Sequence, residues 1–180
     1  SHTCAITTTN AAYCWGFNSV GQLGDGTTAD KNVPTLMSDP SGGAVQWSQI
    51  SGGQSYTCAV TAANTAYCWG GNGYGQVGDN TTASRNVPTL VSTPSGGAVQ
   101  WSQIAAGFSH TCAVTTTNAA YCWGSNILGQ LGIGSTTNAS VPATVVGSLS
   151  FTRLSTGTLY TCRSEEHTSE LQSRFGISYA

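Results

Sequence analysis

Charged side chains are scarce in this sequence of 180 residues. Lys and Arg together number 5 and Asp and Glu number 7, so that charged residues make up 7% of the chain, against about 25% in an ordinary soluble domain. So few basic residues cannot form a surface for the phosphate backbone, which excludes nucleic acid as a partner. No run of 18 apolar residues occurs, so we expect no membrane span.

Helix signals and catalytic groups are also lacking. No stretch has the apolar periodicity of an amphipathic helix. The histidines His2 and His110 occupy corresponding positions of a repeat, where we expect them to anchor a loop by a hydrogen bond. The acidic residues before position 163 are Asp25, Asp30, Asp39 and Asp79, all in expected loops. None of them is paired with a histidine, so we predict neither an enzyme nor a cofactor.

What the sequence does contain is a repeat of 54 residues. Residues 32–50 match residues 86–104 at 17 of 19 positions, and residues 1–16 match residues 109–124 at 15 of 16. The third unit is four residues shorter, and Phe151 stands in it at the position of the tryptophan that opens the other units. Such self-similarity is typical of solenoids and propellers.

One unit predicts four short strands. In the middle unit we expect them at residues 47–50, 56–61, 65–69 and 87–91, separated by Gly- and Asn-rich turns. Pro88 suits an edge strand, where its missing N–H breaks no ladder bond. A four-stranded antiparallel unit of this length favours a β-propeller blade. The alternative is a β-solenoid, but solenoid repeats are usually shorter and their strands run parallel.

The repeated residues resemble a known family. The pattern Trp-x-x-Ile-x-x-Gly-x-x-His/Tyr-Thr is followed by Tyr-Cys-Trp-Gly-x-Asn-x-x-Gly-Gln-Leu/Val-Gly. This is similar to the repeat of the regulator of chromosome condensation family and recurs through residues 1–162. The resemblance implies a seven-bladed propeller. We therefore expect an all-β fold, an open arc of about three four-stranded antiparallel blades out of seven.

The blades divide residues 1–162. We expect partial blades at about 1–37 and 151–162 and complete blades at 47–91 and 101–146. Residues 163–180 break the repeat and resemble a translated short-read sequencing adapter. We interpret them as a non-native tail outside the natural domain.

The cysteines recur with the repeat. Three pairs are separated by nine residues: Cys4 and Cys14, Cys58 and Cys68, and Cys112 and Cys122. Across a hairpin the members of each pair lie opposite each other, near the reach of a disulfide. Buried thiols are an alternative, and zinc is a poor third choice because each pair supplies two ligands. The recurrence favours disulfides, with Cys162 unpaired by truncation because Gln172 replaces its partner.

Disulfides predict an oxidising compartment, so we expect an extracellular or cell-surface protein, with the periplasm as an alternative.

The tryptophans are expected to be core anchors of two kinds. Trp47 and Trp101 lie on first strands, and Trp15, Trp69 and Trp123 lie on third strands. The Gly-Asp-x-Thr sequences at 24–27 and 78–81 could suggest calcium loops. The third copy lacks the carboxylate, which favours Asx turns and predicts no metal site.

These features favour a non-catalytic binding module that recognises an unknown protein or surface ligand through blade loops. Tyr74 and Leu128, in loops that vary between units, are candidate contact residues. Two alternatives stay open. One is a carbohydrate-binding propeller, which needs exposed tryptophans beside carboxylates. The other follows from the resemblance, whose family includes an exchange factor for a Ran-type GTPase; that role requires an intracellular protein with free thiols.

Overall fold

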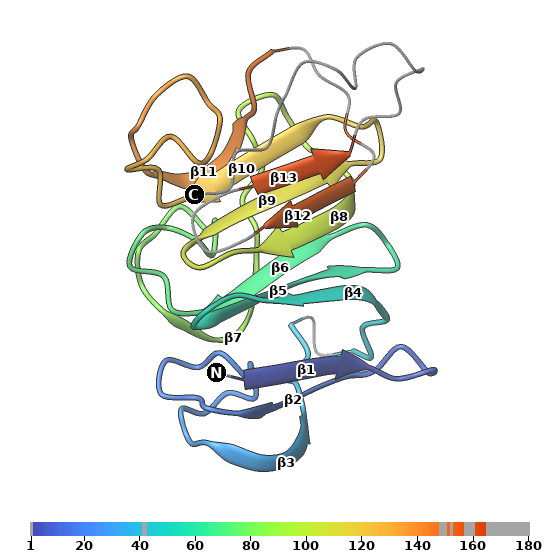
Figure 1. Cartoon of the computed structure of the whole chain (residues 1–180). Coiled ribbons are helices and arrows are strands. Elements are labelled where there is room, and N and C mark those ends of the chain that lie inside the picture. Colours follow the sequence, from blue (N-terminus) through green and yellow to red (C-terminus); the bar gives the residue numbers. More distant parts are fainter. Residues whose placement is uncertain (1, 41–42, 148–150, 152, 157–160, 165–180) are drawn as a thin grey trace.

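The structure, a computed structural model, describes residues 2–40, 43–147, 151, 153–156 and 161–164 (Figure 1). Thirteen strands in this part of the chain form four antiparallel sheets. The first sheet contains β1 (His2–Ile6), β2 (Ala12–Gly16) and β3 (Lys31–Leu36). The second contains β4 (Trp47–Gly52), β5 (Tyr56–Thr61), β6 (Ala66–Gly70) and β7 (Arg85–Leu90).

The third sheet repeats the second with β8 (Trp101–Ala106), β9 (His110–Thr115), β10 (Ala120–Gly124) and β11 (Ala139–Thr144). The last sheet pairs β12 (Arg153–Thr156) with β13 (Thr161–Ser164). Within each sheet, strands adjacent in sequence are adjacent in space, and every pairing is antiparallel. This confirms the prediction of propeller blades and excludes the parallel rungs of a solenoid. None of the described residues forms a helix long and apolar enough to cross a membrane.

The strands β4, β6 and β7 differ from the sequence prediction by one or two residues at their ends. The strand β4 continues past residue 50 to Gly52, because Ser51 and Gly52 pair with β5. The strand β7 begins at Arg85 rather than at residue 87, because Arg85 pairs with Gly70 after a shift of register. Pro88 lies in β7, which is the edge strand of its sheet as predicted.

The sheets stack face to face in chain order (Figure 1). The strands β5 and β9 are therefore buried at every position, because a neighbouring sheet covers each of their faces. Between the second and third sheets, buried residues of both form one apolar cluster that contains Tyr56, Val60, Trp101, Ile104 and Trp123. In β1, by contrast, half-buried and exposed positions alternate, since only one face of the first sheet is covered.

Candidate functional site

The longest loops of each blade lie at one end of its sheet. In the second sheet the β4–β5 turn and the β6–β7 loop share this end, and the N–H of Gly71 donates to the carbonyl of Ser55 at 2.8 Å. The same bond joins Ser125 to Ser109 in the third sheet at 2.8 Å. We call this end the loop rim. It comprises the long loops 17–30, 71–84 and 125–138 and the short turns 53–55 and 107–109.

A buried asparagine organises each long loop. The Oδ1 of Asn72 accepts the N–H of Val77 at 2.9 Å, and its Nδ2 donates to the carbonyls of Thr81 and Ala83, both at 3.0 Å. Asn18 and Asn126 make the corresponding bonds in the other two loops. One side-chain amide thus bonds to backbone groups up to 11 residues further along the chain, so the loops are rigid parts of the frame.

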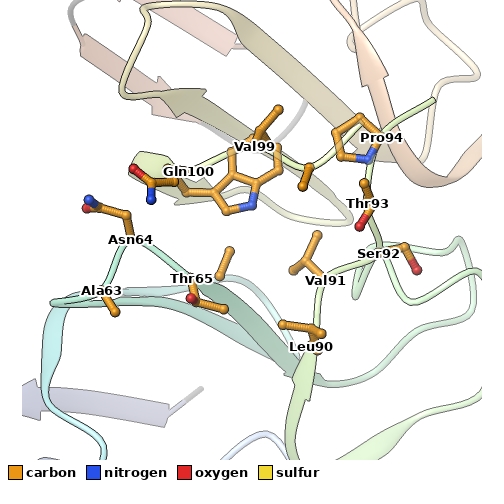
Figure 2. Close-up of a pocket in the computed structure, with 13 residues that line it drawn as sticks. Ala63, Asn64, Thr65, Leu90, Val91, Ser92, Thr93, Pro94, Val99 and Gln100 are labelled. Atoms are coloured by element: carbon orange, nitrogen blue, oxygen red, sulfur yellow. The ribbon is translucent and has the colours of Figure 1, made fainter. Parts of the chain in front are cut away.

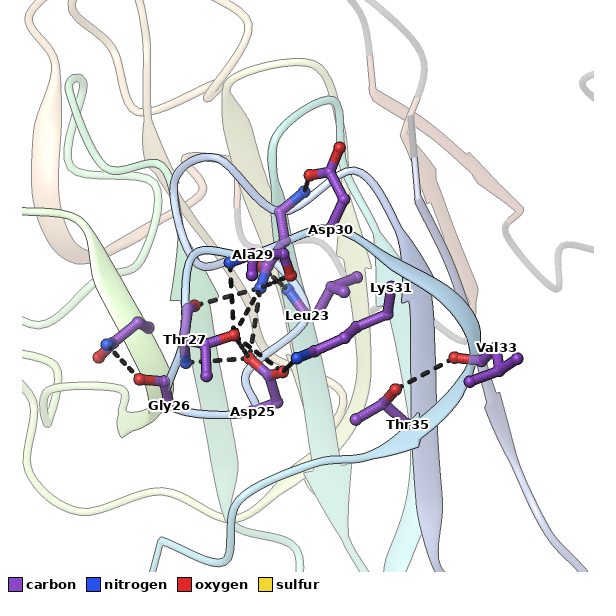
Figure 3. Close-up of polar contacts among 11 residues, drawn as sticks. Leu23, Asp25, Gly26, Thr27, Ala29, Asp30, Lys31, Val33 and Thr35 are labelled. Carbon is purple, nitrogen blue, oxygen red and sulfur yellow. Dashed lines mark hydrogen bonds and ion pairs between the residues drawn. The ribbon is translucent and has the colours of Figure 1, made fainter.

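Asp25 and Asp79 stabilise their loops through hydrogen bonds and ion pairs within the same blade. The N–H of Thr27 donates to Asp25 at 3.0 Å in an Asx turn, and Lys31 lies 3.2 Å from the same carboxylate (Figure 3). Burial alone would raise the pKa of Asp25, but the hydrogen bonds from Thr27 and the Lys31 ammonium together bring it below its usual value. Asp79 is held in the same way by Thr81 and by Arg85, at 2.6 Å.

These contacts leave the carboxylates occupied and favour the Asx turn over a calcium loop. In the part of the chain that the structure describes, no three His, Cys, Asp or Glu side chains are grouped as a metal site would require. The Nε2 of His2 lies 2.7 Å from the Thr57 hydroxyl of the next blade, and His110 is fully buried at the start of β9.

Of the ten large apolar side chains that are exposed among the described residues, five lie on the loop rim and five lie on β3, on β7 and after β11. Tyr74 and Leu128, the two contact residues predicted from the sequence, are 49% and 64% exposed. The structure adds three residues that the sequence reasoning missed, which are Phe17, Phe108 and Ile127. Phe17 and Ile127 flank the loop asparagines, so a comparison of the positions that differ between units could have found them.

Tryptophans join each blade to the loop of the blade before it. The indole N–H of Trp69 donates to the carbonyl of Gln22 at 3.0 Å, and that of Trp123 donates to Gln76 at 2.9 Å. Both indoles are fully buried. Trp15, the third tryptophan predicted as an anchor of this kind, is half-buried.

Trp47 and Trp101, the core anchors expected on first strands, are buried, each in edge contact with a tyrosine. Four of the five tryptophans are therefore inaccessible to a ligand. This gives no support to the carbohydrate-binding alternative, which needs indole faces exposed beside carboxylates.

Three cross-strand disulfides lie in the structure: Cys4–Cys14, Cys58–Cys68 and Cys112–Cys122. Each joins two neighbouring strands of one sheet at directly opposed positions, with 4.1 Å between the Cα atoms. All but Cys4 are buried against the neighbouring blade. The prediction for Cys162 concerns a side chain that lies outside the described residues.

The opposite end of the blades carries a hollow that recurs with the repeat (Figure 2). In the second blade it lies between residues 63–66, 90–94 and 98–101, and in the first blade between the equivalent residues 11–12, 36–39 and 44–47. Each has a volume of about 190 Å³. That volume is below the 300–1,000 Å³ or so of ordinary small-molecule sites.

With this geometry in view, comparisons with known proteins identify the repeat. The model of the regulator of chromosome condensation (RCC1) repeat matches residues 10–60, 64–114 and 118–162. The chain belongs to the RCC1 repeat family. Among solved structures, Prp20p of Saccharomyces cerevisiae is similar, with a TM-score of 0.76 and 22% identity over 90% of this chain and 41% of that one. At this identity the similarity shows the fold alone.

Curated RCC1-repeat relatives are more similar in sequence. The ultraviolet-B receptor UVR8 of Arabidopsis thaliana is 36% identical over 141 residues, which cover 78% of this chain and 31% of the receptor. The human probable E3 ubiquitin-protein ligase HERC4 is 35% identical over 148 residues, which cover 82% of this chain and 14% of the ligase. The chain thus spans less than a third of these relatives.

Proposed function

We propose that this RCC1-repeat chain is a non-catalytic, protein-binding part of a β-propeller and that the loop rim makes the contact. The observation that carries the proposal is that five exposed apolar side chains, Tyr74 and Leu128 among them, stand on the loop rim, whose long loops are held by buried asparagines. Clustered exposed apolar groups mark interaction sites, and a rigid loop loses little entropy on binding.

Relatives support a protein as the ligand. The crystal structure of Prp20p was described together with the binding of Prp20p to Gsp1p and histones, and a second structure has yeast RCC1 bound to Kap60. The three disulfides support a location outside the cytosol, at the cell surface or beyond, for the protein that contains this chain.

Site-directed photo-crosslinking tests the proposal. A photoreactive benzoylphenylalanine is placed at Tyr74 on the loop rim or, as the matched control, at Leu90, which is similarly exposed at the opposite end. Each chain is irradiated in an extract of the source cells. We expect position 74, and not position 90, to give discrete protein adducts that excess unmodified chain suppresses. Adducts at neither position would refute protein binding, and adducts at position 90 alone would refute the role of the loop rim.

The exchange-factor alternative predicts a different result. In that case the chain would accelerate the release of GDP from a purified Ran-type GTPase. We expect no acceleration, because we identify no long insertion that could displace a nucleotide in the described loops.

A further inference from the structure

The tip of each long loop is a tight turn. The hydrogen bonds that hold its backbone do not involve the side chains of its two central residues. In the second blade the N–H of Gly75 donates to the carbonyl of Asn72 and closes the turn at 2.9 Å. The N–H of Tyr74 donates to the side chain of Gln76, also at 2.9 Å. The third blade repeats both bonds at Gly129 and Leu128. The side chains of the two residues between the asparagine and the glycine therefore take no part in the hydrogen bonds that close their turn.

These central pairs differ between blades while the frame around them is constant. The frame reads Asn-x-x-Gly-Gln-Leu/Val-Gly in all three loops. The central pair is Ser19–Val20 in the first, Gly73–Tyr74 in the second and Ile127–Leu128 in the third. The hollows at the opposite end vary less, because nine of the 13 residues that line the second hollow are identical to their equivalents in the first unit. Variable side chains on a constant frame are typical of recognition positions.

The turns form a staggered row across the blades. A side-chain carbon placed on Gly71 of the second blade would lie 3.6 Å from Val20 in the turn of the first. The stagger recurs, since a carbon on Gly70 would lie 3.1 Å from the Cα of Gln22, and one on Gly124 would lie 3.2 Å from that of Gln76. Each turn thus rests on the start of the next long loop, and a single partner can contact several turns.

The row carries no charge. Residues 17–21, 71–75, 107–109 and 125–129 contain no Lys, Arg, Asp or Glu. The nearest carboxylates along the first two loops, Asp25 and Asp79, are paired with Lys31 of β3 and Arg85 of β7. The Asp30 carboxylate accepts the backbone N–H of Asn18 at 2.8 Å. A charged partner surface would lose hydration on contact with this row and find no opposite charge to replace it.

We infer that the turn pairs are the specificity-determining residues of the loop rim and that they recognise an uncharged, apolar segment of a protein. This inference rests on the proposed function and assigns its contact to Tyr74 and Leu128 in particular. Tyrosine is enriched among residues that dominate binding energy, because it buries a large area at a low cost in conformational entropy.

Selection from a phage-displayed library of random 12-residue peptides tests the inference on the whole chain. Selected peptides are measured against the wild type, the double variant Tyr74→Ser/Leu128→Ser and the control Leu90→Ser. We expect them to be apolar and uncharged, to bind the wild type and the control equally, and to bind the double variant at least tenfold or so more weakly. The melting temperature of the double variant should stay within about 2 °C of the wild type, as for other surface changes.

The other outcomes separate the inference from the proposed function. Peptides that are lost on Leu90→Ser and retained on the double variant would overturn the inference and leave protein binding intact at the opposite end. Peptides that depend on the turns but carry several charges would overturn the assigned chemistry. If no peptide distinguishes the wild type from either variant, the inference is wrong, and protein binding then depends on the photo-crosslinking result alone.

Discussion

Replacing Gly78 by alanine should break the contact that joins the second blade to the third. Gly78 has a φ of +77°, a backbone conformation that a residue with a Cβ adopts at a cost. A Cβ at this position would lie 2.5 Å from the Nε1 of Trp123, whose indole is fully buried. The indole would have to move, and its hydrogen bond to the carbonyl of Gln76 would be weakened or lost.

Three contributions add up to the loss of stability in Gly78→Ala. The left-handed conformation costs about 1–2 kcal/mol for a residue other than glycine. Overpacking against a buried ring costs about 1–3 kcal/mol, and the loss of a buried hydrogen bond costs about 1 kcal/mol. We therefore expect the free energy of unfolding of Gly78→Ala to fall by about 3–6 kcal/mol, a large loss for one methyl group.

Two matched variants separate the contributions. Gly132 occupies the same loop position in the third blade with a φ of +64°, and the nearest atom to an added Cβ is 3.4 Å away, on Val145. Gly132→Ala should therefore cost only the conformational part, about 1–2 kcal/mol. Gly73 has open space around it, so Gly73→Ala should change stability by less than about 0.5 kcal/mol.

Urea denaturation followed by tryptophan fluorescence measures all three variants. Equal losses in Gly78→Ala and Gly132→Ala would show that the indole contact contributes nothing and would refute the reasoning.

Three further predictions concern the frame. Thiol titration under denaturing conditions should find one reactive thiol per chain, that of Cys162, and two or more would contradict the disulfides. Burial, helped by the N-terminal charge, lowers the pKa of His2 from 6.5 to about 4. The unfolded chain then binds more protons in this range, so stability should fall as the pH drops from about 6.5 to 4; an unchanged profile in His2→Gln would contradict this. Asn72→Ala leaves buried backbone groups unpaired and should lower the free energy of unfolding by about 3 kcal/mol in urea, so a loss below about 1 kcal/mol would be evidence against the rigid loop.

Much of the fold could be predicted because the same residues recur at a fixed spacing. The repeat located the strands to within two residues, and the opposition of Cys58 and Cys68 followed from a hairpin with its turn midway between them. Tyr74 and Leu128 could be chosen because they vary between units. Each of these features depends on residues that are close in sequence or equivalent in the repeat.

The contacts between blades could not be predicted in the same way. The indole N–H of Trp69 donates to the backbone carbonyl of a residue 47 positions earlier in the chain. Every residue has a backbone carbonyl, so the amino-acid sequence does not indicate which one accepts this bond. The asparagine that holds each loop was interpreted only as a turn residue, because its bonds reach backbone groups at the far end of the loop.

Hydrogen–deuterium exchange on the chain, with and without a protein identified by photo-crosslinking at position 74, tests the central claim most directly. The loop rim is predicted to be the contact, so the partner should slow exchange in residues 17–21, 71–75 and 125–129 and leave residues 62–65 and 91–100 unchanged. Protection confined to residues 62–65 and 91–100 would contradict the claim and place the contact at the opposite end of the blades.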